Sequence, residues 1–178
     1  MLTVVFIAIC GVLYPLLIAA VAKLASGGGK GETISVNGKV VGYANIGQKF
    51  TDDKYFWSRP SAVAYDAAGS AGSNKGPTNP DYLKQVRDRI DTFLVHNPAV
   101  KKTDIPSELV TASGSGLDPD LSPQGVYIQV ARISKTRNIS QEKVKSLVES
   151  QIKKPLLGFL GPDKVNVLKL NIALDKLK

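Results

Sequence analysis

The distribution of polar residues divides the chain into two unequal parts. Residues 2–22 form a continuous apolar run, and the first charged side chain is that of Lys23. As a helix this run would be about 31 Å long, close to the roughly 30 Å hydrocarbon thickness of a bilayer. One segment can cross the hydrocarbon only as a helix, because a helix makes its backbone hydrogen bonds within itself. The pattern therefore predicts one transmembrane helix within residues 1–24.

Two other interpretations of the apolar run stay open at the level of sequence. The run could be a cleaved signal peptide, because Ala20-Val21-Ala22 has the spacing of a cleavage site. Against this, no basic residue precedes it, and it is longer than the usual apolar region of a signal. A lipoprotein signal would use Cys10, but Ile9 stands where a small residue is expected. We favour an uncleaved anchor.

Small or narrow residues recur every three or four positions in the apolar run. Ala8, Gly11, Pro15 and Ala19 would share one helix face, where small side chains let a second helix approach closely. Chance is the alternative, because Gly and Ala are frequent in membrane helices. The stripe predicts a packed partner helix. Pro15 also predicts a lost ladder bond and a kink.

Beyond the apolar run the chain has the pattern of one soluble domain. Residues 25–32 are a flexible linker by composition, and residues 33–178 mix strand and helix signals. Asn37-Gly38 between alternating β-branched residues predicts a β-hairpin with strands at Thr33–Val36 and Lys39–Tyr43. The fold class is therefore α+β: a single transmembrane helix followed by one mixed α/β domain.

Three helices are predicted from a capping residue followed by apolar side chains at helical spacing. Asn79 with Pro80, Ser122 with Pro123, and Ser140 mark their starts. The expected inward faces are Leu83, Val86, Ile90 and Phe93 or Leu94 in the first helix, Val126, Val130 and Ile133 in the second, and Val144, Leu147 and Val148 in the third. Further short strands are expected at residues 55–57 and 109–112. A final strand is expected at residues 165–174, with a short helix possible at its end.

Composition narrows the function classes. The formal net charge is +8, yet the Lys and Arg residues are scattered and mixed with acids, which argues against a nucleic-acid surface. Basic charge instead suits an acidic protein surface or anionic lipid. The one cysteine, Cys10, lies in the apolar run, so disulfides and thiol chemistry are not expected in the domain. One histidine and one membrane cysteine give no support for a metal site.

Candidate catalytic motifs have simpler structural interpretations. Ser140 and Lys143 match the S-x-x-K spacing of some serine acyl-enzymes, which leaves a signal-anchored extracytoplasmic serine hydrolase as an alternative. A capped helix start explains the same residues. His96 is the single possible triad base, and no G-x-S-x-G motif accompanies it. We therefore expect no catalytic residue.

Two polar, glycine-rich loops lead to predicted helix starts. Backbone N–H groups there could bind an anion or a carboxylate partner, which keeps an anion-binding module as a second alternative. The loops could equally be capping loops without a ligand. The candidate residues are Trp57, Arg59, Pro60, Ser73, Asn74, Gly76, Pro77, Thr78 and Asn79 in the first loop, and Ser113, Gly114, Ser115, Gly116 and Asp118 in the second.

At these residues the chain resembles the C subunit of the bacterial Kdp-type potassium-transporting ATPase. The resemblance covers nearly the whole chain, in order and with similar spacing. The segments that carry it are Gly11-Val-Leu-Tyr-Pro-Leu16, Asn37-Gly38, Trp57-Ser-Arg-Pro-Ser61, residues 72–80, residues 111–119, Gln129-Val-Ala-Arg-Ile133, Leu157-Gly-Phe-Leu-Gly161 and Val165-Asn-Val-Leu-Lys-Leu-Asn171.

The resemblance implies a non-catalytic accessory subunit. Such a subunit assembles in the cytoplasmic membrane with a channel-like potassium-binding subunit, a P-type ATPase subunit and a small single-span peptide, and no nucleic acid is involved. The sequence agrees with a non-catalytic role, because no Asp-Lys-Thr-Gly-Thr phosphorylation motif occurs. The resemblance also implies a domain on the extracytoplasmic side, although Lys23, Lys30 and Lys39 follow the helix and a simple positive-charge count would keep the domain inside.

The resemblance further implies that the subunit raises the ATP affinity of the ATPase subunit, as a catalytic chaperone. No cofactor would be bound tightly, and ATP would be met through the partner ATPase subunit. Gln129 is the position that corresponds to a glutamine proposed to assist the nucleotide. A domain outside the membrane cannot touch cytosolic ATP across about 30 Å of hydrocarbon. Any effect from outside must therefore be an allosteric coupling through the membrane helices.

Overall fold

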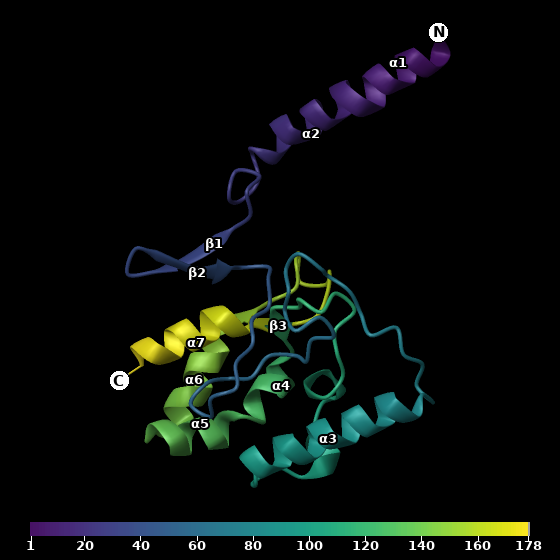
Figure 1. Ribbon diagram of the computed structural model, residues 1–178. Helices are drawn as coiled ribbons and strands as arrows, with labels where there is room; N and C mark the ends of the chain where they lie inside the picture. Colours follow the sequence, from purple (N-terminus) through teal and green to yellow (C-terminus); the bar gives the residue numbers. More distant parts are fainter. Residues whose placement is uncertain (178) are drawn as a thin grey trace. The chain divides into compact units, whose positions relative to one another are not determined.

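The computed structural model describes residues 1–177, which group into two compact units, residues 1–43 and residue 44 onward. The first unit begins with a continuous apolar helix made of α1 (Leu2–Ala8), a π-helical segment η1 (Ile9–Leu13) and α2 (Tyr14–Ala22) (Figure 1). Leu2–Ala22 is long and apolar enough to cross a membrane, and none of it is buried by the rest of the chain. The predicted helix is confirmed.

The π-helical segment accommodates Pro15. In a regular α-helix the ring of Pro15 would meet the carbonyl group of Gly11, four residues earlier, and Pro15 has no N–H to donate to it. A π turn over Ile9–Leu13 widens the helix at this point. The expected local disturbance at Pro15 therefore takes the form of a π turn.

The predicted hairpin is present with the predicted bounds. Strands β1 (Thr33–Val36) and β2 (Lys39–Tyr43) pair antiparallel. Asn37 and Gly38 both have positive φ, 50° and 78°, as a tight two-residue turn between twisted strands requires. The register shifts between Ile34 and Ser35.

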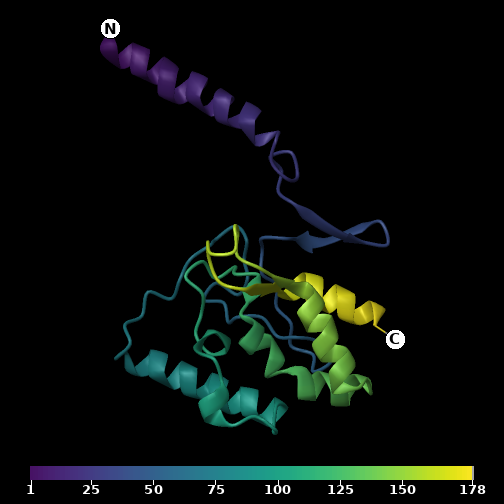
Figure 2. The same ribbon diagram turned by 180° about the vertical axis from the view of Figure 1, so that it is seen from behind.

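Helices α5, α6 and α7 lie side by side in the second unit, and α3 lies away from them (Figures 1 and 2). Three very short antiparallel strands, in the order β3-β5-β4, connect to these helices. The elements are α3 (Pro80–His96), the 3-10 turns η2 (Lys102–Asp104) and η3 (Ser107–Leu109), β3 (Asp120–Leu121), α4 (Pro123–Tyr127), α5 (Val130–Arg137), α6 (Gln141–Gln151), β4 (Ile152–Lys153), β5 (Lys164–Asn166) and α7 (Val167–Lys176).

The core of this unit forms around the predicted faces of the second and third helices. Val126, Val130 and Ile133 are fully or almost fully buried, as are Val144 and Val148. Leu147 is partly buried against them. The predicted second helix is divided, because α4 ends at Tyr127 and α5 begins at Val130. The predicted face of α3 is less buried than expected: Phe93 is in the core, but Leu83 is 39% exposed.

Two strand predictions are wrong because local hydrogen bonds replace pairing. At residues 109–112 the chain turns: the 3-10 segment η3 is followed by a bond from Thr111 N to Ser107 O of 2.8 Å. At residues 55–57 the backbone is bonded by side chains and not by a neighbouring strand.

The strand predicted at residues 165–174 is much shorter than expected, and the helix that was considered possible at its end takes up most of the segment. Strand β5 ends at Asn166, whose side chain accepts a bond from Lys169 N at 3.0 Å and begins α7. Val167, Leu170, Asn171 and Leu174 are all buried and follow the i, i+3, i+4, i+7 spacing of a helix face. The near-alternation that starts at Val165 concealed this pattern.

Candidate functional site

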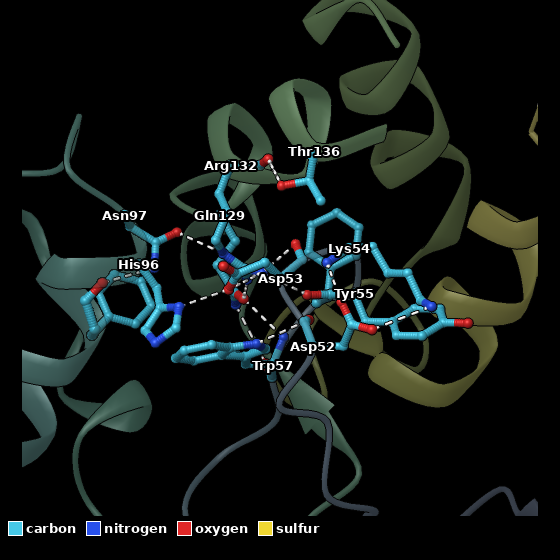
Figure 3. A network of polar contacts seen from close by, with 12 residues as sticks. Asp52, Asp53, Lys54, Tyr55, Trp57, His96, Asn97, Gln129, Arg132 and Thr136 are labelled. Atoms are coloured by element: carbon cyan, nitrogen blue, oxygen red, sulfur yellow. Dashed lines mark hydrogen bonds and ion pairs between the residues drawn. The ribbon is translucent and has the colours of Figure 1, made fainter. Parts of the chain in front are cut away.

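Side chains from two helices hold residues 53–57 in place; Figure 3 shows Arg132 and Gln129 beside this segment. Arg132 donates to Asp53 O at 2.5 Å and to Tyr55 O at 3.1 Å. Asn171 pairs with both backbone groups of Phe56, at 2.9 and 3.0 Å. Backbone groups that a sheet would have satisfied are therefore bonded to side chains of α5 and α7.

Gln129 performs the same task for Trp57. Its Oε1 accepts from Trp57 N at 2.8 Å and from Arg132 Nη2 at 2.9 Å. Its Nε2 donates to Trp57 O at 3.3 Å and to Gly125 O at 2.9 Å. The side chain is fully buried, and a primary amide has two donors and two acceptor positions to offer. All four are used within the domain.

Arg132 is the buried charge at the centre of this network. Its Nε donates to Asn97 Oδ1 at 3.0 Å, and its Cζ lies 4.8 Å from the ring centre of Trp57. Asp53 is its nearest carboxylate, at 3.6 Å. Burial lowers the pKa of Arg132 to about 10, and the nearby charge of Asp53 opposes part of that shift. Arg132 stays positively charged at neutral pH.

The edge of the network reaches the surface at His96. Its Nδ1 lies 2.8 Å from Asp53 Oδ1, and its ring packs edge-on against Trp57 at 4.8 Å. Both side chains of the pair are more than a third exposed. Asn97 links this end of α3 to the interior of the unit. Its Nδ2 donates to Phe93 O, and its Oδ1 accepts from Arg132 Nε.

The network can fix geometry, but it offers no free reactive group. Its buried donors and acceptors are paired with one another, and the contacts join α3, α5, α7 and residues 53–57 into one framework. Within residues 1–177 no group of three or more His, Cys, Asp or Glu side chains could hold a metal ion. The role of Gln129 toward a nucleotide stays a prediction. For this amide to contact a nucleotide, Gln129 would first have to break one of its present hydrogen bonds, such as that to Gly125 O.

The structure brings the beginning of the first glycine-rich loop against the second. Arg59 Nη1 lies 3.0 Å from Asp118 Oδ2, and Ser113 N donates to Pro60 O at 3.2 Å. Gly116, with φ of 69°, is required here because a Cβ would lie 2.8 Å from Ala71 O. Asp118 also accepts from Asp120 N through Oδ1, so one carboxylate closes a turn and pairs with Arg59.

The other residues of these loops have simpler surroundings. Asn79 caps α3 through a bond from Tyr82 N of 3.0 Å, as predicted. Five residues just before it are exposed: Ser73, Asn74, Gly76, Pro77 and Thr78. In the second loop Gly114 and Ser115 are exposed, and Ser115 O accepts from Ser70.

An internal carboxylate already occupies the helix start that follows the second loop. Glu108 accepts from Ser122 Oγ at 2.6 Å and from Ser122 N at 3.1 Å, and Ser122 in turn caps Gly125 N. A Cβ on Gly125 would lie 2.3 Å from Glu108 Oε1. An external anion at α4 would have to displace Glu108.

The remaining candidates lie elsewhere in the chain. Ser140 accepts a bond from Lys143 N at 3.3 Å and so acts as the cap of α6. The stripe residues Ala8, Gly11, Pro15 and Ala19 are exposed, and a Cβ on Gly11 would meet nothing within 4 Å. Nothing inside the chain therefore requires a glycine at position 11.

The sequence pointed to Gln129 and Trp57, which bond to each other, but not to Arg132 and Asn171 of the same network. Arg132 and Asn171 both lie within segments that carried the resemblance, yet a polar residue on a helix gives no sign of burial by itself. The available signal was their place on otherwise apolar faces, beside Ile133 and Leu170. The sequence carries no comparable signal for Asn97 and Glu108, because their hydrogen-bond partners are distant along the chain.

The geometry defines a class of protein: an α+β domain with an internally satisfied polar framework, carried on one helix suited to a membrane. Comparison with known proteins specifies the family. The family model described as K+-transporting ATPase, c chain, matches residues 1–176. The chain belongs to that family of potassium-transporting ATPase subunits.

Individual relatives agree over almost their whole length. The "Potassium-transporting ATPase KdpC subunit" of Flavobacterium johnsoniae is 63% identical over 99% of this chain and 95% of its own. The proteins of the same name from Bacteroides fragilis and Caldanaerobacter subterraneus are 53% and 46% identical. They cover 99% and 97% of this chain, and 94% and 90% of their own lengths. These names fit a single-pass protein of a membrane transport complex.

Proposed function

We propose that the chain is a non-catalytic accessory subunit of an ATP-driven potassium import pump. In this role it stabilises assembly with the potassium-binding subunit, the P-type ATPase subunit and a small single-span subunit. It also raises the affinity of the ATPase subunit for ATP. It acts by coupling through membrane helices and holds no cofactor of its own.

The observation that carries this proposal is the state of Gln129. Its amide is fully buried and fully bonded, so the domain does not present it as a ready nucleotide ligand. The uncovered stripe around Gly11 supplies a surface through which the chain could instead meet another helix. An effect on ATP affinity is then a coupling free energy between distant sites.

Assembly is tested by Gly11→Leu in the complete complex. Leucine is a good helix former, and Gly11 has open space around it within the chain, so the variant helix should form. A bulky side chain on the stripe should hold a partner helix away, and the copurified yield of the partner subunits should fall. Ala20→Leu is the matched control, because one position along the regular helix α2 turns its side chain about 100° away from Ala19 of the stripe. Equal yields from both variants would contradict the role of the stripe.

The side of the membrane is tested by labelling intact cells. We propose that the domain is extracytoplasmic. In a Cys10→Ser background, Gln124→Cys and Lys135→Cys each place one thiol at an exposed position. A membrane-impermeant maleimide should label both without lysis. Labelling of both only after lysis would place the domain inside, and direct contact with ATP would then become possible.

A further inference from the structure

Four large apolar side chains gather at the tip of one hairpin. Strands β4 and β5 are joined by residues 154–163, and within this loop Leu156, Leu157, Phe159 and Leu160 are 70%, 74%, 73% and 52% exposed. The loop, coloured yellow-green, extends outward from the unit in both views (Figures 1 and 2). Single exposed apolar residues are ordinary, but a contiguous group marks a surface that binds something.

The tip is a closed turn whose backbone holds these side chains outward. Leu156 and Leu160 form an antiparallel bridge, and Leu160 N donates to Leu156 O at 2.9 Å. Leu157 has a φ of 55°, a left-handed conformation that costs a non-glycine residue about 1 kcal/mol or more. A strained, exposed leucine contributes little to folding, so its apolar side chain points to a role in contact with a partner.

The base of the same hairpin is basic. Residues 152–164 contain three lysines, Lys153, Lys154 and Lys164, and a single acid, Asp163, for a formal charge of +2. Lys154 pairs with Asp163 at 2.8 Å, and Lys164 with Asp120 at 2.6 Å, so the base of the hairpin carries a net charge of +1 once Asp120 is counted. An apolar tip above a basic collar matches the two layers of an anionic membrane surface, namely acyl chains below phosphate head groups.

The length of the connecting chain limits how far this hairpin can lie from the membrane anchor. Asn166, at the end of β5, donates to Ala44 O at 2.8 Å, so the chain enters the second unit at the base of the hairpin. Thr33 pairs with Tyr43, so the small hairpin adds little length to the tether. The spacer is then residues 23–32, at most about 35 Å when extended. Phe159 is seven residues from Asn166, at most about 25 Å away.

We propose that residues 156–160 insert their apolar side chains into the boundary between head groups and acyl chains of an anionic bilayer. The chain would then meet the membrane twice, once through its helix and once through this tip. Because the linker favours rebinding by keeping the tip close to the surface, a weak second contact is sufficient. Two contacts would also restrict how the domain turns on its linker. This goes beyond the accessory role and does not depend on it.

The test is depth-dependent fluorescence quenching in the full-length chain. In a Cys10→Ser background, Phe159→Cys is labelled with bimane, and the protein is reconstituted into vesicles of phosphatidylcholine and phosphatidylglycerol. Gln124→Cys, which is exposed on α4, receives the same label as a control. Doxyl-labelled lipid should quench the label at position 159 and leave that at 124 unaffected. Aqueous iodide should quench the label at position 124 and leave that at position 159 unaffected.

A second variant separates insertion by the protein from insertion by the label. Leu157→Asn removes one apolar side chain, and asparagine tolerates the left-handed conformation found there, so the turn should be kept. It should reduce quenching by doxyl lipid at position 159, as should vesicles without phosphatidylglycerol. Iodide quenching at both positions without doxyl quenching would overturn the proposal. Protection from iodide without doxyl quenching in the assembled complex would also overturn it, and would assign the tip to a protein partner.

Discussion

At the scale of single residues, the domain depends on side chains that substitute for a missing strand. Gln129, Arg132 and Asn171 bond to the backbone of residues 53–57. A buried polar group without a partner costs about 1–3 kcal/mol. Replacing one such side chain should therefore remove several hydrogen bonds at once and lower the free energy of unfolding.

Gln129→Leu tests this directly. The change keeps a similar volume but leaves both backbone groups of Trp57 without their partner, and it removes an acceptor from Arg132. We expect the free energy of unfolding to fall by about 3 kcal/mol or more. Urea unfolding of the detergent-solubilised chain, followed by circular dichroism, measures it. Gln124→Leu, on the exposed side of α4, should change it by less than about 0.5 kcal/mol. Unchanged stability together with a higher KM for ATP in the complex would favour a nucleotide role instead.

Asp118→Ala tests the contact between the two glycine-rich loops. Asp118 closes a turn on Asp120 N and pairs with Arg59, and both members of the pair are less than one third exposed. We expect a loss of about 1–2 kcal/mol in the same unfolding measurement. Asp66→Ala is the matched control, because Asp66 Oδ1 also accepts a turn bond, from Ala68 N, but at the exposed surface. Equal losses would mean that the pair with Arg59 contributes nothing.

At the scale of elements, prediction from sequence succeeded where the local signal decides the structure. Asn37-Gly38 set the hairpin, and Asn79, Ser122 and Ser140 each cap the helix that follows. It failed at residues 55–57, where apolar and aromatic residues suggested a strand. Whether such a segment pairs with a strand or with side chains depends on residues more than 70 positions away, such as Gln129.

Asn166→Ala tests an element boundary that the sequence analysis missed. Asn166 caps α7 through Lys169 N and also donates to Ala44 O at 2.8 Å. A lost cap costs about 1 kcal/mol, and the lost second bond about 1 kcal/mol more. Thermal unfolding of the full chain should therefore show a larger fall in Tm than for Ser140→Ala, which removes one exposed cap. A larger fall for Ser140→Ala would show that the bond to Ala44 is not formed.

At the scale of the whole molecule, the apolar helix was predictable because length and lack of charge suffice to define it. The polar framework was not predictable from the sequence, because burial of Arg132 and Asn171 depends on how α3, α5 and α7 come together around residues 53–57. No local pattern reports such an arrangement. The family could still be identified, because motifs in order along the chain carry information that their chemistry alone does not.

The proposed coupling through the membrane helix would be a property of the whole molecule, and replacing that helix tests it. If ATP affinity is raised through helix contacts, then exchanging residues 2–22 for an unrelated span of leucine and alanine should abolish the effect while the domain stays anchored. The KM of the purified complex for ATP should rise to its value without this chain.

The native chain, expressed at the same level, is the control for this exchange. The domain's fold, followed by its thermal unfolding, should be unchanged, because the helix and the domain belong to two separate compact units. A KM that stays low with the foreign helix would contradict transmission through the membrane. It would place the coupling in the domain's own contacts with its partner subunits, and the polar framework around Arg132 would then be the element whose rigidity those contacts use.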